Sequence, residues 1–187
     1  MVVKNKDNIT LAEVWGPPAW YLIHHITRNI IDKTFDQIAI VNFFTILWVF
    51  IPCAICRNHY MDHVKKDPYI HYITNGNDLD RWGFELHNKI NKMLDKSIMS
   101  YETYQRNYTN SPTAPNLKRF IDIVVELHMT PDISISEIQD LKLFLKTIII
   151  LYPLPIPSKN KTISLEKLTK VYDYQSLKSF YNNQNVL

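Results

Sequence analysis

Residues 35–56 read FDQIAIVNFFTILWVFIPCAIC, and this stretch decides the fold. The segment Phe35–Ile51 is almost entirely apolar, which predicts a helix that is buried on most of its sides. Pro52 disfavours helical geometry in the residue before it and therefore ends this helix. A new helix is expected over Cys53–Lys65, and Pro68 blocks its continuation. The sequence thus places a Cys-x-x-Cys motif at the start of a helix, directly after a break.

Two further segments are expected to pack with these helices. The segment Trp15–Ile31 opens with Trp-Gly-Pro-Pro, whose prolines suit the first turn of a helix and cannot lie deep inside one. The segment Asp78–Lys96 opens with an acidic turn, which suits the positive end of the helix dipole, and its apolar residues recur every four positions. Short connections between these segments predict a four-helix bundle, followed by a short fifth helix.

The glycine content also favours an all-α fold. The chain has 187 residues, of which 46% are hydrophobic and 3 are glycine. Helices need no glycine, whereas the turns of many β-hairpins and phosphate-binding loops do. No two glycines are close together, which excludes G-x-G-x-x-G dinucleotide-binding folds and P-loops.

Composition divides the chain into two predicted regions. Residues 10–105 are expected to form the bundle, and residues 106–187 a C-terminal helical extension. Thr109–Pro115 has the composition of a linker. Helices in the extension are expected over Asn116–His128, Ser134–Tyr152 and Ser164–Tyr181. The extension contains no cysteine and no tryptophan, so it offers no cluster of chemically active side chains.

Charge and hydropathy exclude several classes of partner. The net charge of +3 comes from scattered lysines rather than a basic stripe, so no nucleic-acid surface is predicted. The N-terminus lacks the apolar region of a secretory signal. The longest apolar segments, 38–55 and 141–156, are interrupted by polar residues and prolines. Neither supplies the roughly 20 apolar residues of a membrane-spanning helix.

The two cysteines, Cys53 and Cys56, point to chemistry rather than to stability. A disulfide between them closes a very short loop and contributes about 2 kcal/mol at best. Redox chemistry and metal binding are the remaining uses. His59 and His63 follow at zinc-ligand spacing, but all four side chains lie on one stripe of a helix, whereas zinc sites usually draw ligands from two elements. A zinc-binding structural module and a non-catalytic helical adaptor are the alternatives to a redox enzyme.

The position of the motif favours redox chemistry. Free backbone N–H groups and the positive end of the helix dipole surround both sulfur atoms at a helix start. This environment lowers the pKa of a thiol and favours the reactive thiolate. Thioredoxin-type proteins also carry Cys-x-x-Cys at a helix start, but they need a β-strand directly before it. Here a long helical segment precedes the motif.

Two further clusters indicate a flat aromatic ligand. His87 and Asn91 lie one turn apart on a predicted helix, and Asn88 adds another amide. Trp20 and His24 form an aromatic–imidazole pair on the first helix. Three helices that bring such groups to a Cys-x-x-Cys motif make a flat aromatic cofactor the expected ligand.

These motifs resemble the Erv/ALR family of flavin-linked sulfhydryl oxidases. The matching pieces are Trp20-x-x-x-His24, the Phe43–Pro52 approach to the cysteines, Cys56-x-x-His59-Tyr60, and Trp82 with His87-Asn88-x-x-Asn91-x-x-Leu94-x-Lys96. They occur in the family's order and spacing. The runs Trp15–Pro18 and Cys56–Tyr60 are more similar to versions from large DNA viruses than to cellular ones.

The resemblance implies a helical bundle that binds FAD and oxidises protein dithiols. By position, Cys53 would exchange with the substrate and Cys56 would lie next to the flavin, which would pass electrons to O2 and yield H2O2. It also implies a homodimer in which faces of the Phe43/Phe44 type lie near the contact between subunits. The protein would be found in the host cytoplasm or in the virion. The implied FAD contacts are Gly16, Trp20, His24, His59, Tyr60, Trp82, His87, Asn88, Ile90, Asn91 and Lys96.

The sequence departs from the family pattern in two ways. Pro17 stands where cellular relatives have Arg, so one FAD contact is missing. The chain also lacks the shuttle and structural cysteine pairs of cellular members, which predicts direct attack on Cys53 by a protein dithiol, such as a small thioredoxin-like protein. The resemblance covers roughly Val14–Tyr104 and the C-terminal half matches nothing in the family, so the region Asn116–Leu187 is expected to be dispensable for flavin binding.

Overall fold

The computed structural model describes residues 11–29, 36–110, 112–152 and 157–183, and all regular structure in these ranges is helical. The all-α prediction is therefore confirmed. The helices are α1 (Leu11–Asn29), α2 (Gln37–Phe50), α3 (Ala54–Lys66), α4 (Gly76–Met93), α5 (Tyr101–Thr109), α6 (Ala114–His128), α7 (Ile135–Leu151), α8 (Ser158–Thr169) and α9 (Tyr174–Asn182), with a short 3-10 turn at Tyr69–His71. No helix in the described ranges is both long and apolar enough to cross a membrane.

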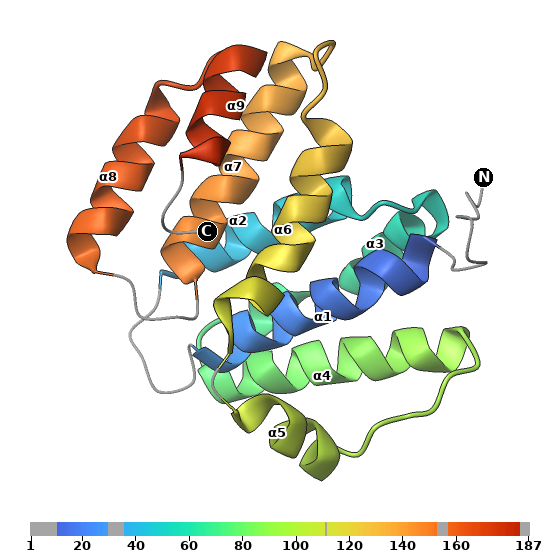
Figure 1. The fold of residues 1–187 in the computed structure, drawn as a ribbon. Helices are drawn as coiled ribbons and strands as arrows, with labels where there is room; N and C mark the ends of the chain where they lie inside the picture. Colours follow the sequence, from blue (N-terminus) through green and yellow to red (C-terminus); the bar gives the residue numbers. More distant parts are fainter. Residues whose placement is uncertain (1–10, 30–35, 111, 153–156, 184–187) are drawn as a thin grey trace.

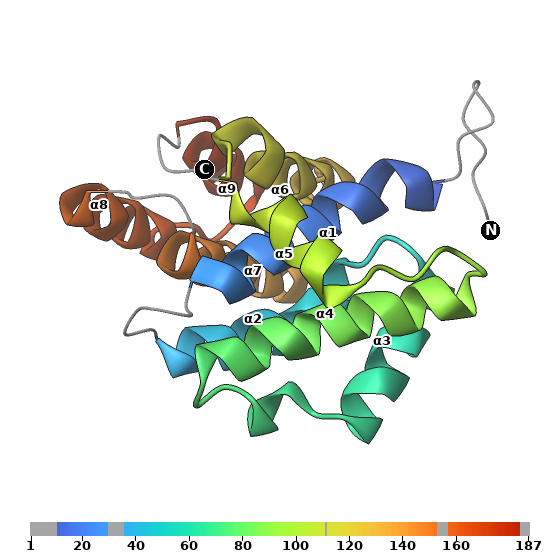
Figure 2. The ribbon, with the colours of Figure 1, turned by 90° about the horizontal axis from the view of Figure 1, so that it is seen from below.

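Helix α1 lies at the centre of this arrangement (Figure 1). It packs against α4 on one side and against α6 on the other, and Figure 2 shows the same order from below. Helix α2 packs against α7 and contacts α3. Helices α8 and α9 lie on the outer side of α7 in Figure 1. The helices of the predicted bundle and those of the extension are therefore in direct contact.

An aromatic cluster joins the two predicted regions. The ring centroid of Phe144 on α7 lies 6.4 Å from that of Phe43 and 4.8 Å from that of Phe50, both on α2. Phe120 on α6 lies 6.5 Å from Phe144. One hydrophobic core thus extends from the bundle into the extension. The domain boundary at residue 105 stays a prediction, and it does not separate two cores.

The same packing covers Phe43 and Phe44, the residues expected near a contact between two subunits. Phe43 is 0% exposed and Phe44 is 1% exposed. Both side chains are covered within the chain, since Phe43 packs beside Phe144 and Phe44 against Trp82. A contact between two copies would therefore have to use a different surface.

The prediction for the start of the first helix is wrong. Helix α1 begins at Leu11, so Pro17 and Pro18 lie in its second turn. Two missing N–H donors weaken a helix locally, but tertiary packing can outweigh this loss. Pro18 is buried, and α1 is packed between two helices. The predicted apolar residues Ile30 and Ile31 lie outside the described residues.

The break between α2 and α3 is confirmed. Asp36 caps α2 by accepting the N–H of Ala39 at 2.9 Å. The helix ends at Phe50, and Ile51 is extended, as expected of a residue before proline. Cys53 is the N-cap of α3. Helix α3 ends at Lys66, before Pro68.

The last predicted helix, Ser164–Tyr181, is wrong because it consists of two helices. Helix α8 ends at Thr169, and α9 begins at Tyr174. Asp173 accepts the N–H of Ser176 at 2.8 Å, and the Ser176 hydroxyl accepts the N–H of Asp173 at 3.1 Å. This capping box starts a new helix. The break lets the chain turn back, so that Val171 and Leu177 are both buried.

A buried carboxylate connects α1, α4 and α5. Asp80 on α4 is 0% exposed and accepts hydrogen bonds from Thr27 at 3.4 Å, Arg28 at 3.1 Å and Tyr101 at 3.3 Å, and also from Tyr104. Burial raises the pKa of this carboxyl group, while its hydrogen bonds and the charge of Arg28 act in the opposite direction. The network fixes α5 against the first and fourth helices.

Candidate active site

A cavity of about 380 Å³ lies between the helices, next to the Cys-x-x-Cys motif. Residues from α1 to α6 line it. Most of the predicted site residues are among them, namely Gly16, Trp20, Cys56, His59, Tyr60, His87, Ile90, Asn91 and Lys96. Cys53, His24, Trp82 and Asn88 do not line this cavity. Its volume is within the usual range for small-molecule and cofactor sites.

The two cysteines connect this cavity with the protein surface. They form a disulfide with a Cα–Cα distance of 5.2 Å, and the Sγ atom of Cys53 accepts the N–H of Cys56 at 3.2 Å. Cys56 lies in the cavity wall, whereas Cys53 lies before α3 and outside that wall; both side chains are half-buried. The neighbouring Ile55 is 67% exposed. Arg57 fixes the helix break by donating to the carbonyl oxygen of Ile51 at 2.9 Å.

A stack of rings forms one wall of the cavity. Trp20 on α1 and His87 on α4 are almost parallel, with an interplanar angle of 7° and a centroid distance of 4.1 Å. His24 lies behind them, fully buried, with its Nε2 atom 2.8 Å from Nδ1 of His87. Burial lowers the pKa of His24, and burial and the charge of Lys96 lower the pKa of His87 to about 4. Both imidazoles are therefore neutral at pH 7.

Two predicted FAD contacts have their polar atoms engaged elsewhere. The Asn88 amide donates to the carbonyl of Met99 at 2.8 Å and accepts the N–H of Met99 at 3.0 Å. Trp82 is buried in the core, and its Nε1 donates to the carbonyl of Asp67 at 3.0 Å. These side chains fix the segments around α4. Their contacts with FAD stay predictions.

The end of α4 explains how Lys96 reaches the cavity. The prediction that this helix continues to Lys96 is wrong, because α4 ends at Met93. Asp95 has a positive φ of 53°, and the Lys96 N–H returns to the carbonyl of Asn91 at 2.8 Å. The Asp95 N–H also bonds to the carbonyl of Lys92 at 3.3 Å, which completes a Schellman motif. This turn places Lys96 and Asn91 in the same wall.

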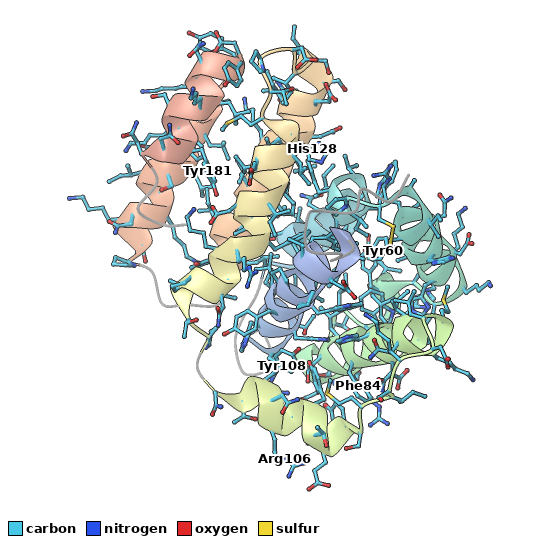
Figure 3. All side chains as sticks on the ribbon, turned by 45° about the vertical axis from the view of Figure 1, so that its right-hand side comes forward. Tyr60, Phe84, Arg106, Tyr108, His128 and Tyr181 are labelled. Carbon is cyan, nitrogen blue, oxygen red and sulfur yellow. A yellow bond between two sulfur atoms is a disulfide. The ribbon has the colours of Figure 1, made fainter. Side chains whose placement is uncertain are left out.

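Sequence reasoning missed three aromatic residues in the wall: Trp15 on α1, Tyr108 on α5 and Phe120 on α6. Tyr108 points from α5 towards α1 in Figure 3, with its ring centroid 4.6 Å from that of His24. Trp15 belongs to the Trp-Gly-Pro-Pro run, which was a usable signal. No local pattern indicates Phe120. Its position bears on the expectation that the extension is dispensable for flavin binding, which stays a prediction.

The lining fits a cofactor with a flat ring system and an anionic part. The walls are mainly apolar and aromatic, with a few polar groups from His59, Asn91 and Lys96. The Nε1 atom of Trp15 is buried and has no hydrogen-bond partner among the described residues. A buried N–H donor without a partner is costly, so an acceptor on a bound molecule would satisfy it. The Lys96 ammonium offers a positive charge for a phosphate.

A buried histidine beside the site predicts sensitivity to acid. His25 is 4% exposed, with its ring 4.3 Å from Tyr21, and burial and the nearby charge of Arg28 lower its pKa to about 4. The unfolded chain takes up this proton near pH 6.5 and the folded chain near pH 4. Stability is therefore lost as the pH falls from 6.5 towards 4. This histidine alone would lower the free energy of unfolding by about 2 kcal/mol between pH 7 and pH 5.

The measurement is urea unfolding at pH 7 and pH 5. Between pH 7 and pH 5, the free energy of unfolding of His25→Phe is expected to fall by about 2 kcal/mol less than that of the unmodified protein. His71 is exposed, so His71→Asn is the control and should keep the original dependence. Equal pH dependence in His25→Phe and the unmodified protein would show that His25 is protonated in the folded state.

Comparison with known proteins agrees with this geometry. The sequence profile of the Erv1/Alr family matches residues 17–109. An FAD-linked sulfhydryl oxidase of African swine fever virus is 32% identical over 103 residues, which cover 52% of this chain and 82% of the relative. A putative FAD-linked sulfhydryl oxidase of Invertebrate iridescent virus 3 is 24% identical, covering 51% of this chain and 66% of the relative.

A probable FAD-linked sulfhydryl oxidase of Acanthamoeba polyphaga mimivirus is 27% identical, covering 48% of this chain and 64% of the relative. No solved structure matches the chain. All three relatives come from large DNA viruses, as the motifs predict. The matched region contains both cysteines and the Trp20–His87 stack. On this evidence, the chain belongs to the Erv1/Alr family.

Proposed function

We propose that the protein is an FAD-dependent thiol oxidase that forms disulfides in protein substrates. The observation that carries the proposal is the placement of the Cys53–Cys56 disulfide, with Cys56 in the wall of an aromatic cavity and Cys53 outside it. The names of the viral relatives support both the activity and the cofactor.

The chain's own residues account for the transfer of electrons from the substrate. A substrate thiolate attacks the Sγ atom of Cys53, which forms a mixed disulfide and releases Cys56 as a thiolate. A second substrate thiol then displaces Cys53, so the substrate leaves as a disulfide and Cys53 and Cys56 are reduced. The N-terminal end of α3 stabilises the Cys56 thiolate through its dipole. FAD, when bound, would supply the acceptor for this electron pair and the reactivity with O2 that gives H2O2.

The cavity suggests which groups would bind FAD. Cys56, Trp20 and His87 would hold the flat ring system, and Lys96 would hold the pyrophosphate. His24 would act through His87 by holding its ring in place. Gly16, His59, Tyr60, Ile90 and Asn91 would complete the contacts. Because the relatives are viral, we place the activity in the cytoplasm of an infected host cell.

The first test is the cofactor content of the purified protein. We expect a yellow protein with about one FAD per chain, absorbance near 450 nm, and H2O2 production when a dithiol is added in air. The aromatic cavity beside Cys56 is the reason. A folded, colourless protein that takes up no FAD would contradict the proposal. Stoichiometric zinc in that protein would support a zinc-binding structural module, and neither ligand would support a helical adaptor.

A further inference from the structure

We infer that the C-terminal extension is part of the cofactor site, in which Phe120 on α6 forms a wall that retains the bound FAD. This inference rests on the proposed function, because it takes the cavity as the FAD site. It reverses the expectation from the sequence that the extension is dispensable for flavin binding.

The position of Phe120 is the first argument. It is 0% exposed and lines the cavity together with Ile23 from α1 and Leu47 and Ile51 from α2. The bundle supplies these three residues, and the extension supplies Phe120. Without the aromatic ring of Phe120, the cavity would lose one of its apolar surfaces. Because Phe120 is fully covered, its ring fills the wall to native packing density, and truncating it would leave a void beside a bound ligand.

The second argument is that the whole extension fixes this side chain. Phe120 packs beside Phe144 of α7, which in turn packs against α2. Two residues to either side of Phe120, Lys118 and Asp122 form an ion pair on α6, and both bond to Tyr181 of α9. Helices α7 and α9 therefore hold α6 in a defined position.

The third argument concerns α1, which carries Trp15 and Trp20. Helix α6 packs along α1, and the N–H of Thr113 just before α6 donates to the Tyr21 hydroxyl at 3.2 Å. Figure 1 shows α6 crossing over α1 on the side away from α4. The extension thus supplies one wall directly and supports the helix that supplies another.

The test measures FAD affinity rather than turnover. Full-length apoprotein is titrated with FAD, and binding is followed by quenching of flavin fluorescence. Phe120→Ala is compared with Leu117→Ala, since both side chains are 0% exposed on α6 but Leu117 does not line the cavity. Both substitutions leave a cavity in the core and destabilise the fold, so unfolding temperature is measured alongside.

Phe120→Ala is expected to raise the Kd for FAD by about tenfold or more, whereas Leu117→Ala should change it by less than about threefold. If Phe120→Ala does not fold, Phe120→Leu serves instead, with a smaller expected increase of several fold. Equal weakening by the two substitutions, or an unchanged Kd in the Phe120 variants, would overturn the inference. Failure of the unmodified protein to bind FAD would instead overturn the proposed function on which it rests.

Discussion

Replacing Cys53 with serine is expected to reduce turnover by more than about 1000-fold while producing a new long-wavelength absorbance band. The substitution removes the sulfur that meets the substrate and leaves Cys56 as the only thiol of the pair. Cys56 lies in the wall of the cavity that we assign to FAD. A thiolate held against an oxidised flavin gives charge-transfer absorbance, which a spectrophotometer detects directly.

Replacing Cys56 with serine is expected to reduce turnover as strongly but to give no such band. Its remaining thiol, Cys53, is outside the cavity wall. The matched control is Asn58→Ser, an exposed position on the same helix, which should keep both activity and the normal flavin spectrum. A band in Cys56→Ser and none in Cys53→Ser would reverse the two roles.

The helix break was predictable because its causes are local. An apolar run of helical length followed by Pro52 determines where α2 ends, and the structure agrees. The start of α1 was not predictable by the same rule. The local cost of Pro17 and Pro18 argues for a later start, and only packing between α4 and α6 outweighs it.

The structure brings together those predicted site residues that lie on short periodic patterns. Trp20, His87 and Asn91 were identified from their spacing, and the structure brings all three to one cavity. The Asn88 amide is engaged by Met99 on the next segment, which spacing alone does not reveal, and its contact with FAD stays a prediction. Phe120 could not be identified at all. It reaches the cavity only through the packing of α6 on α1, which no local sequence pattern encodes.

The surface around Cys53 determines which dithiols can reach the disulfide. Cys53 and Cys56 are the only two cysteines in the 187 residues, so no second cysteine pair in this sequence can carry electrons to them. In the proposed mechanism, a substrate dithiol therefore reaches Cys53 itself, at the start of α3. Ala54 and Ile55 beside it are exposed and would contact an approaching protein. Attack on a disulfide requires the incoming sulfur to align with the sulfur–sulfur bond, which a fixed protein surface can arrange.

A small folded partner with its own Cys-x-x-Cys is therefore expected to be oxidised at least about tenfold faster than a reduced, unfolded protein at equal thiol concentration. An exposed dithiol on a fixed surface can meet Cys53 in one orientation, whereas the thiols of an unfolded chain must be ordered at each encounter. Oxygen consumption is measured with a reduced thioredoxin-like protein, a reduced unfolded protein and dithiothreitol, which reports the reactivity of the disulfide without docking. The Cys53→Ser variant gives the background for all three. If the unfolded protein is oxidised as fast as the thioredoxin-like one, access to Cys53 does not select the partner, and the enzyme acts on accessible dithiols of any kind.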